Sequence, residues 1–146
     1  SFNMITDYWK DTGTPDDIIH ANEQVLKNMQ PYFFGKKEND VYVNGKLVVG
    51  KDTLIKNGSS ITGPVLIGKN CVIEPNTIIG PNTSIGDNSI LSGCDISNSI
   101  IMSGCKIECN AKIRQSIIST NSHITQNKKN DKEQVFLIGE GTKITL

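Results

Sequence analysis

The chain has 146 residues, a formal net charge of zero and an aromatic content of 5%. The length suits one domain, or one domain with an appendage. The balanced charge gives no electrostatic footprint for nucleic acid, and no apolar run approaches the ~20 residues that a membrane-spanning helix needs. No signal-peptide pattern opens the chain. We therefore expect a cytoplasmic protein without nucleic-acid or membrane partners.

The first forty residues contain one predicted helix. Thr14 suits the N-cap, Pro15 suits the first helical position, and Asp17 stands three residues after the cap, which is a capping-box pattern. Apolar residues then follow at helical spacing, namely Ile18, Ile19, Ala21, Val25, Leu26 and Met29. Pro31 is expected to end this amphipathic helix.

From residue 41 onward, aliphatic residues recur every six positions. They stand in phase at Val43, Val49, Ile55, Ile61, Ile67, Ile73, Ile79, Ile85 and Leu91. A small or modest side chain follows four positions later, and in several hexads an Asn, which tolerates positive φ, stands just before it. A short repeat at a fixed period dictates the architecture of a whole domain. Each hexad is therefore predicted to form a short strand and a tight corner, with coils stacked on one another.

The repeat loses its phase after Leu91 and then recovers. The spacing resumes with one five-residue step, at Ile101, Ile107, Ile113, Ile118 and Ile124. Residues 127–134 are polar and mixed in charge, so a solvated loop is predicted there. Residues 138–146 supply a last hexad. The predicted solenoid domain therefore spans residues 41–146, with residues 1–40 as a separate region before it.

Four consecutive hexads resemble the repeats of left-handed parallel β-helices: IGKNCV, IEPNTI, IGPNTS and IGDNSI, over residues 67–90. The resemblance implies three hexads per triangular coil and a left-handed turn. The predicted fold class is mainly β, a single-stranded left-handed parallel β-helix preceded by one amphipathic α-helix. The aromatic residues 32–34 are expected to cover the open end of the first coil, because an end coil exposes strand edges.

Residues 8–22, YWKDTGTPDDIIHAN, resemble the W-x-D-x-G-T/K-P stretch of sugar-1-phosphate nucleotidylyltransferases, in particular the long-form glucose-1-phosphate thymidylyltransferases. In that family the stretch closes the nucleotidyltransferase domain, and a left-handed β-helix follows. The resemblance implies that residues 1–40 are the C-terminal remnant of that domain. We therefore expect a preceding domain that binds the nucleoside triphosphate and the sugar 1-phosphate.

The family reaction joins a nucleoside triphosphate and a sugar 1-phosphate, and releases pyrophosphate. Such transfer needs charge neutralisation by Mg²⁺, which one or two carboxylates commonly hold. The resemblance implies that Asp11 is a Mg²⁺ ligand in the full-length protein; alternatively, Asp11 caps a turn before Gly13. Trp9 and Gly13 are expected to serve packing and the turn. The chain by itself is predicted to have no catalytic residue, to hold no cofactor and to be inactive.

A second hypothesis is an acyltransferase that uses acetyl-coenzyme A on an amino-sugar phosphate, as many hexapeptide-repeat proteins do. Such chemistry needs a general base, usually His, and the chain contains only His20 and His123. His20 lies in the predicted helix and is expected at its surface. His123 is the candidate base, although it suits an outward, solvated position better. Residues 127–129 could contact coenzyme A phosphates.

A third hypothesis is a purely structural solenoid that assembles subunits into a homo-oligomer, with a trimer favoured. The four cysteines are consistent with a structural role. Cys71 and Cys105 occupy small inward positions, and Cys94 and Cys109 fall at corners or faces. Because paired short spacings and nearby His ligands are missing, we expect packing rather than zinc binding.

Overall fold

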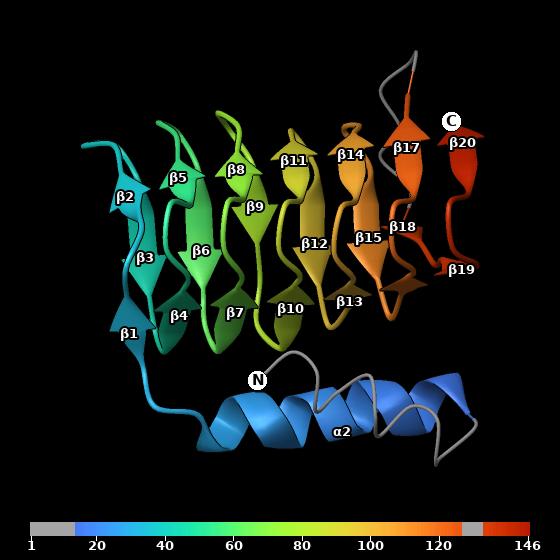
Figure 1. The fold of residues 1–146 in the computed structure, drawn as a ribbon, viewed down its shortest axis with the longest axis horizontal. Helices are drawn as coiled ribbons and strands as arrows, with labels where there is room; N and C mark the ends of the chain where they lie inside the picture. Colours follow the sequence, from blue (N-terminus) through green and yellow to red (C-terminus); the bar gives the residue numbers. More distant parts are fainter. Residues whose placement is uncertain (1–13, 127–132) are drawn as a thin grey trace.

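The computed structural model describes residues 14–126 and 133–146, and Figure 1 shows a parallel β-solenoid with one helix lying along it. The chain visits three parallel sheets in turn, which confirms a coil with three faces. The predicted fold class is confirmed: the described residues are mainly β and form a solenoid preceded by one helix. Within the described ranges, no helix has the length and apolarity that crossing a membrane requires.

Each sheet takes one short strand from each coil. Sheet A contains β1 (Tyr32–Phe33), β4 (Leu47–Val49), β7 (Val65–Ile67), β10 (Thr83–Ile85), β13 (Ile100–Ile101), β16 (Ile117–Ile118) and β19 (Leu137–Ile138). Sheet B contains β2 (Lys36–Lys37), β5 (Leu54–Ile55), β8 (Val72–Ile73), β11 (Ile90–Ser92), β14 (Lys106–Glu108), β17 (His123–Thr125) and β20 (Lys143–Thr145). Sheet C contains β3 (Tyr42–Asn44), β6 (Ser60–Thr62), β9 (Ile78–Ile79), β12 (Asp95–Ser97), β15 (Lys112–Arg114) and β18 (Glu133–Gln134).

The predicted hexad aliphatics form the core. From Val49 to Ile124 every one of them is fully buried. They stack from coil to coil in register, as Ile61 does beside Ile79. Burying such a side chain contributes about 1.5–3 kcal/mol, and the contacts lie between coils rather than within one. A single coil therefore has little stability of its own.

Ile96 explains the loss of phase after Leu91. It lies in β12, is fully buried, and stands in register with Ile79 and Ile113. The chain thus takes two five-residue steps in succession, so Ser84 pairs with a residue only sixteen positions on, whereas Leu47 pairs with one eighteen positions on. Positive φ at the intervening corners, at Gly93 and Asn98, makes these shorter corners possible.

The boundaries of the solenoid differ from the predicted ones in two places. It begins at Tyr32 instead of residue 41, because β1 and β2 pair with β4 and β5. Tyr32 and Phe33 therefore form the first coil rather than cover its end. The predicted polar loop is also shorter, because Glu133 and Gln134 pair with β15. In both places the unpaired backbone groups of a neighbouring strand offer hydrogen bonds that side-chain composition does not reveal. The remaining loop residues, 127–132, lie outside the described residues.

Helix α2 (Pro15–Asn28) begins as predicted. The Thr14 hydroxyl accepts a hydrogen bond from the Asp17 amide at 3.3 Å, and Pro15 occupies the first turn. Asp16 and Asp17 place negative charge at the positive end of the helix dipole. Figure 1 shows that α2 lies lengthwise across the strands of sheet A. The helix therefore covers the outer face of that sheet.

Apolar contacts and one polar cluster fix α2 to sheet A. Its residues Ile18 and Ile19 pack with Ile100, Met102 and Ile117 of the solenoid, and all five are buried. Asn22, halfway along the helix, is also fully buried. Its amide nitrogen donates to the Asn82 carbonyl at 3.2 Å, and its amide oxygen accepts from the Ser84 hydroxyl. These directional bonds set the position of the helix along the solenoid.

Candidate functional site

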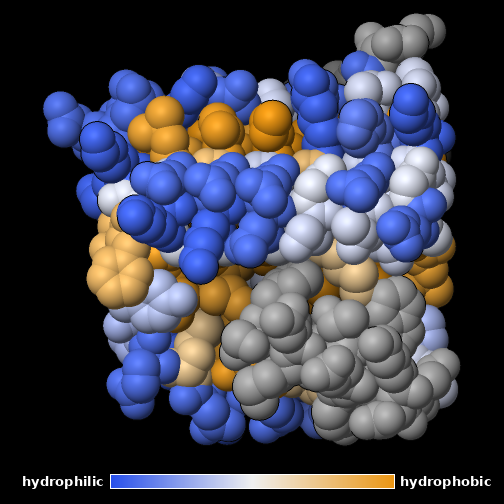
Figure 2. Space-filling model, viewed as in Figure 1, coloured by the Kyte–Doolittle hydropathy of each residue, from blue (hydrophilic) through white to orange (hydrophobic). Residues whose placement is uncertain are grey.

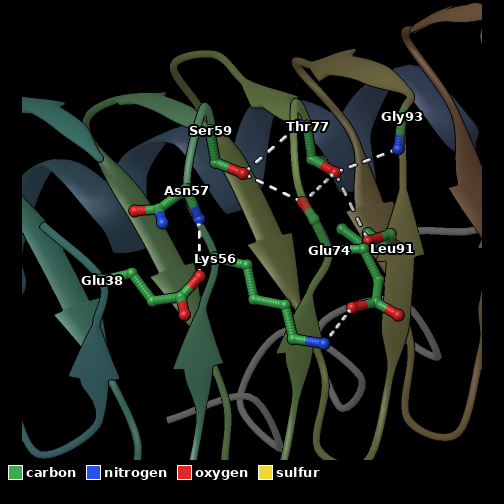
Figure 3. A network of polar contacts seen from close by, with 8 residues as sticks. All are labelled: Glu38, Lys56, Asn57, Ser59, Glu74, Thr77, Leu91 and Gly93. Carbon is green, nitrogen blue, oxygen red and sulfur yellow. Dashed lines mark hydrogen bonds and ion pairs between the residues drawn. The ribbon is translucent and has the colours of Figure 1, made fainter. Parts of the chain in front are cut away.

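Buried hydroxyls at the corners bond each coil to the next, as Figure 3 shows between sheets B and C. The Ser59 hydroxyl donates to the Glu74 carbonyl at 3.0 Å and accepts from the Thr77 amide at 3.3 Å. The Thr77 hydroxyl likewise donates to the Glu74 carbonyl at 2.8 Å and accepts from the Gly93 amide at 3.0 Å. The position must be small because it lies inside a corner. It must be polar because the next coil has an amide that needs a partner.

The same bond recurs along the solenoid. A side-chain oxygen accepts from an amide of the following coil in the pairs Thr53 and Cys71, Ser89 and Cys105, Ser99 and Ser116, and Ser116 and Phe136. All four of these hydroxyl-bearing residues are buried. Both histidines of the chain are exposed, so these hydroxyls have no imidazole base beside them. The corner hydroxyls therefore serve the scaffold, not nucleophilic catalysis.

Charged side chains lie outside the same corner. The Lys56 ammonium contacts Glu74 Oε1 at 2.6 Å, and Glu38 Oε1 accepts from the Asn57 amide at 2.8 Å (Figure 3). The hydrogen bond and the charge of Glu74 raise the pKa of Lys56. Because the two side chains are 34% and 32% exposed, the pair contributes little to stability. They form a polar rim beside the outer face of sheet B.

Of the predicted site residues, the described part of the chain contains only His20 and His123. Asp11, Trp9 and Gly13 lie outside the described residues. His20 is exposed on α2, with its Nδ1 3.9 Å from Glu23 Oε2. His123 is exposed in β17 and points out of sheet B. Across the described residues, no carboxylate lies within ion-pairing distance of His123, so the imidazole has no acidic partner to orient it as a base.

The cysteines are part of the core. Cys71 and Cys105 are buried as predicted, and Cys94 and Cys109, which were expected at corners or faces, are buried as well. Burial raises the pKa of all four thiols, and at Cys94 the neighbouring Cys109 adds to the effect. A raised pKa makes a poor nucleophile and a poor metal ligand. In the described part of the chain, no three His, Cys, Asp or Glu residues gather as metal ligands would.

An apolar row on the outer face of sheet B is the surface feature that the sequence analysis missed. Leu54, Val72 and Ile90 stand in register on three successive coils, and each is half-buried. We call these three residues the sheet B stripe. Figure 2 shows an apolar band over β5, β8 and β11. The sequence contained enough information to predict this row, because each of the three residues directly precedes an inward aliphatic and so must point outward.

Comparison with known proteins places these features in a family. The model of the GMPPB C-terminal domain matches residues 61–145. Glucose-1-phosphate thymidylyltransferase of Streptomyces antibioticus is 33% identical over 143 residues, which cover 98% of this chain and 40% of that protein. Bifunctional protein GlmU of Methanococcus vannielii is 34% identical over 143 residues, covering 94% of this chain and 34% of the relative.

A third relative carries two activities in its name. The bifunctional sugar-1-phosphate nucleotidylyltransferase/acetyltransferase of Sulfurisphaera tokodaii is 32% identical over 150 residues, covering 94% of this chain and 36% of the relative. The chain thus spans between 34% and 40% of the length of these three relatives. The matched region includes both the helix and the solenoid.

Proposed function

Because the chain belongs to the GMPPB C-terminal domain family, we propose that it is the C-terminal part of a sugar-1-phosphate nucleotidylyltransferase. The observation that carries the proposal is the docking of α2 on sheet A through the buried Asn22. The first half of this helix, residues 15–22, is part of the stretch that resembles the end of a nucleotidyltransferase domain. The proposed reaction converts a nucleoside triphosphate and a sugar 1-phosphate into a nucleotide sugar and pyrophosphate. By analogy with the Streptomyces relative, the substrates are dTTP and glucose 1-phosphate.

In this proposal Asp11 helps to hold Mg²⁺ in the full-length enzyme, where the bound ion would neutralise phosphate charge. Asp11 stands three positions before Thr14, the N-cap of α2. The catalytic stretch is therefore joined to the solenoid through a packed helix rather than through a free linker. The chain's own contribution is to support and assemble the catalytic domains.

The catalytic part of the proposal is tested with the full-length protein. Pyrophosphate release from dTTP and glucose 1-phosphate should require Mg²⁺, and Asp11→Asn should lower the rate about tenfold or more. Asp16→Asn, in the first turn of α2, is the matched control and should leave the rate unchanged. An unaltered rate in Asp11→Asn would reject the ligand role. Absence of turnover with every common nucleoside triphosphate would reject the enzyme class.

We assign the assembly role to the sheet B stripe. Its three aliphatics form a flat apolar row, and the ion pair of Lys56 and Glu74 lies beside it. An apolar centre with a polar rim is the usual anatomy of a protein interface. The proposed occupants are the same stripes of neighbouring copies of the chain, which would meet around the symmetry axis of a homo-oligomer, with a trimer favoured.

Light scattering on the purified chain tests the assembly. We expect an oligomer, and expect Val72→Glu to yield a monomer, because a carboxylate would be buried in the interface. Ile78→Glu is the control, since Ile78 is 45% exposed on sheet C. A monomeric wild-type chain at high concentration, or dissociation by both substitutions alike, would contradict the assignment.

Acetyl transfer is the second candidate function, and the bifunctional name of the Sulfurisphaera relative favours it. The candidate base is His123, which is exposed on sheet B. The test is release of free thiol from acetyl-coenzyme A in the presence of a hexosamine 1-phosphate. Loss of this release in His123→Gln, and not in His20→Gln, would support the assignment. If the full-length protein releases no thiol, the candidate is rejected.

A further inference from the structure

Helix α2 covers the outward row of sheet A except at the last strand. Ile100, Ile117 and Leu137 stand in register on β13, β16 and β19. Ile117 packs with α2 and is 3% exposed, whereas Leu137 is 60% exposed. Figure 1 shows that α2 runs back along the solenoid, so its first turn lies beside the last coil. The helix begins at Pro15, and within the described residues nothing continues its cover over Leu137.

A groove of about 210 Å³ lies at this place, between the first turn of α2 and the end of sheet A. Pro15 borders it on the helix side, and Ile117 and Leu137 border it on the sheet side. Gly139 also lines the groove and leaves it open, because a Cβ there would meet only the Thr142 hydroxyl oxygen, at 4.0 Å. An apolar groove of this kind suits a large apolar side chain.

The chain itself offers such a side chain directly before the groove. Because Pro15 borders the groove, the segment that precedes α2 starts from its edge. That segment, residues 1–13, lies outside the described residues, and its sequence is SFNMITDYWKDTG. Trp9 is the apolar residue nearest to Thr14 along the chain. The five residues from one to the other span up to ~17 Å when extended, and closing so short a loop costs little conformational entropy.

From this arrangement we propose that the groove binds the indole of Trp9, so that the segment before α2 folds back over β16 and β19. An indole has a large apolar body, and tryptophan is enriched among the residues that anchor protein contacts. Residues 10–13 between Trp9 and the helix are polar or glycine, which suits a chain that turns back. Docking would also hold Asp11 at a fixed place beside the last coil. The inference does not depend on the proposed enzyme activity.

Tryptophan fluorescence of the 146-residue chain tests the docking, because the sequence contains one Trp. We expect emission at a shorter wavelength than that of N-acetyltryptophanamide. Acrylamide should quench the chain about threefold less than this free indole, since the groove shields Trp9 from water. Emission and quenching equal to those of the free indole would overturn the proposal. If the shift disappears on dilution while the chain stays folded, the groove of a second copy holds the indole, and docking within one chain is rejected.

Two substitutions on the last coil test the location. Leu137→Glu places a carboxylate in the groove and should shift both the emission and the quenching to those of the free indole. Val135→Glu is the matched control, since Val135 is 62% exposed and does not line the groove, and it should leave both unchanged. If Leu137→Glu has no effect, or if Val135→Glu has the same effect, the proposal fails. Circular dichroism melts of both variants establish that they are folded.

A variant without the indole gives an independent measurement. Trp9→Ala should open the groove to the apolar dye 1-anilinonaphthalene-8-sulfonate, so the fluorescence of the dye should rise above its level with the wild-type chain. Adding Leu137→Glu to Trp9→Ala should remove this rise. Equal dye fluorescence with the wild-type chain and with Trp9→Ala would show that the indole does not occupy the groove.

Discussion

The outer faces of sheets A and B both carry a row of aliphatic side chains, but only the row on sheet A is covered by another element of the described residues. On sheet A, Val48, Ile100 and Ile117 point outward and are almost completely buried, because α2 lies over the sheet. On sheet B, the outward Val72 and Ile90 are only half-buried. An outward aliphatic row needs a cover, and for sheet A the chain itself supplies one. For sheet B nothing in the described residues does so, which is why we assign that face to a second copy.

Truncating one outward isoleucine on each sheet is the most direct test of this difference in covering. Ile100→Ala removes a fully buried side chain beneath α2, and should lower the free energy of unfolding by about 2–5 kcal/mol. Ile90→Ala, on the half-exposed stripe, should cost about 1 kcal/mol or less in the monomer. Urea denaturation at low protein concentration measures both. Equal losses would mean that α2 does not cover sheet A in solution.

The polar anchor of the helix should give the next largest effect. Asn22→Leu leaves the Ser84 hydroxyl without its acceptor and the Asn82 carbonyl without its donor. Each unsatisfied buried group costs about 1–3 kcal/mol, and the added leucine offsets part of the loss. We expect a net loss of about 2 kcal/mol in urea denaturation.

A double variant isolates the cause of that loss. Adding Ser84→Ala to Asn22→Leu should recover part of the stability, because the orphaned hydroxyl is removed. Asn28→Leu serves as the control, since Asn28 bonds only to the Gln24 carbonyl on the exposed side of the helix. No recovery in the double variant would show that Asn22 acts through packing alone.

The six-residue spacing was enough to predict the core, because each inward position repeats a side chain of one kind. It failed at Ile96, where two corners are each one residue shorter and a fixed period no longer applies. The amphipathic stripe of α2 predicted a helix but not its partner. Docking depends on outward residues such as Ile100 and Ile117. Each precedes an inward aliphatic, so the spacing marks it as outward, but the spacing does not show which element covers it. The burial of Asn22 could not be predicted from the sequence either, because a polar residue is recognised as buried only once its hydrogen-bond partners are known.

The candidate functional residues were likewise predictable from the sequence only in part. Asp11 was assigned only through resemblance, and nothing in the spacing of the chain marks it. The sheet B stripe joins residues that are eighteen positions apart. Each of them precedes an inward aliphatic, so the spacing places it outward, but only the pairing of the strands shows that the three residues lie side by side.

The buried corner hydroxyls should contribute more to stability than the hydroxyls on the outer faces of the solenoid do. Thr77→Val keeps the size of the side chain but leaves the Gly93 amide without its acceptor. The expected loss is about 1–2 kcal/mol in urea denaturation. Thr62→Val, on the outward side of β6 and half-exposed, is the control and should change little. If Thr77→Val is neutral, the hydroxyl is not needed to satisfy the corner.

The smallest effect is expected at the rim of the stripe, where Lys56→Gln removes the ion pair with Glu74. Both side chains are accessible to water, so the free energy of unfolding at pH 7 should hardly change. Glu74 raises the pKa of Lys56 above its ordinary value of 10.5. A raised pKa in the folded state means that the small stabilisation is present below pH 10.5 and is lost as the pH rises further. Wild type and Lys56→Gln should therefore converge above that pH, which thermal melts between pH 7 and 11 can measure. A large difference at pH 7 would show instead that the rim is shielded from water, as it would be if the stripe were already covered by a partner at the concentration used.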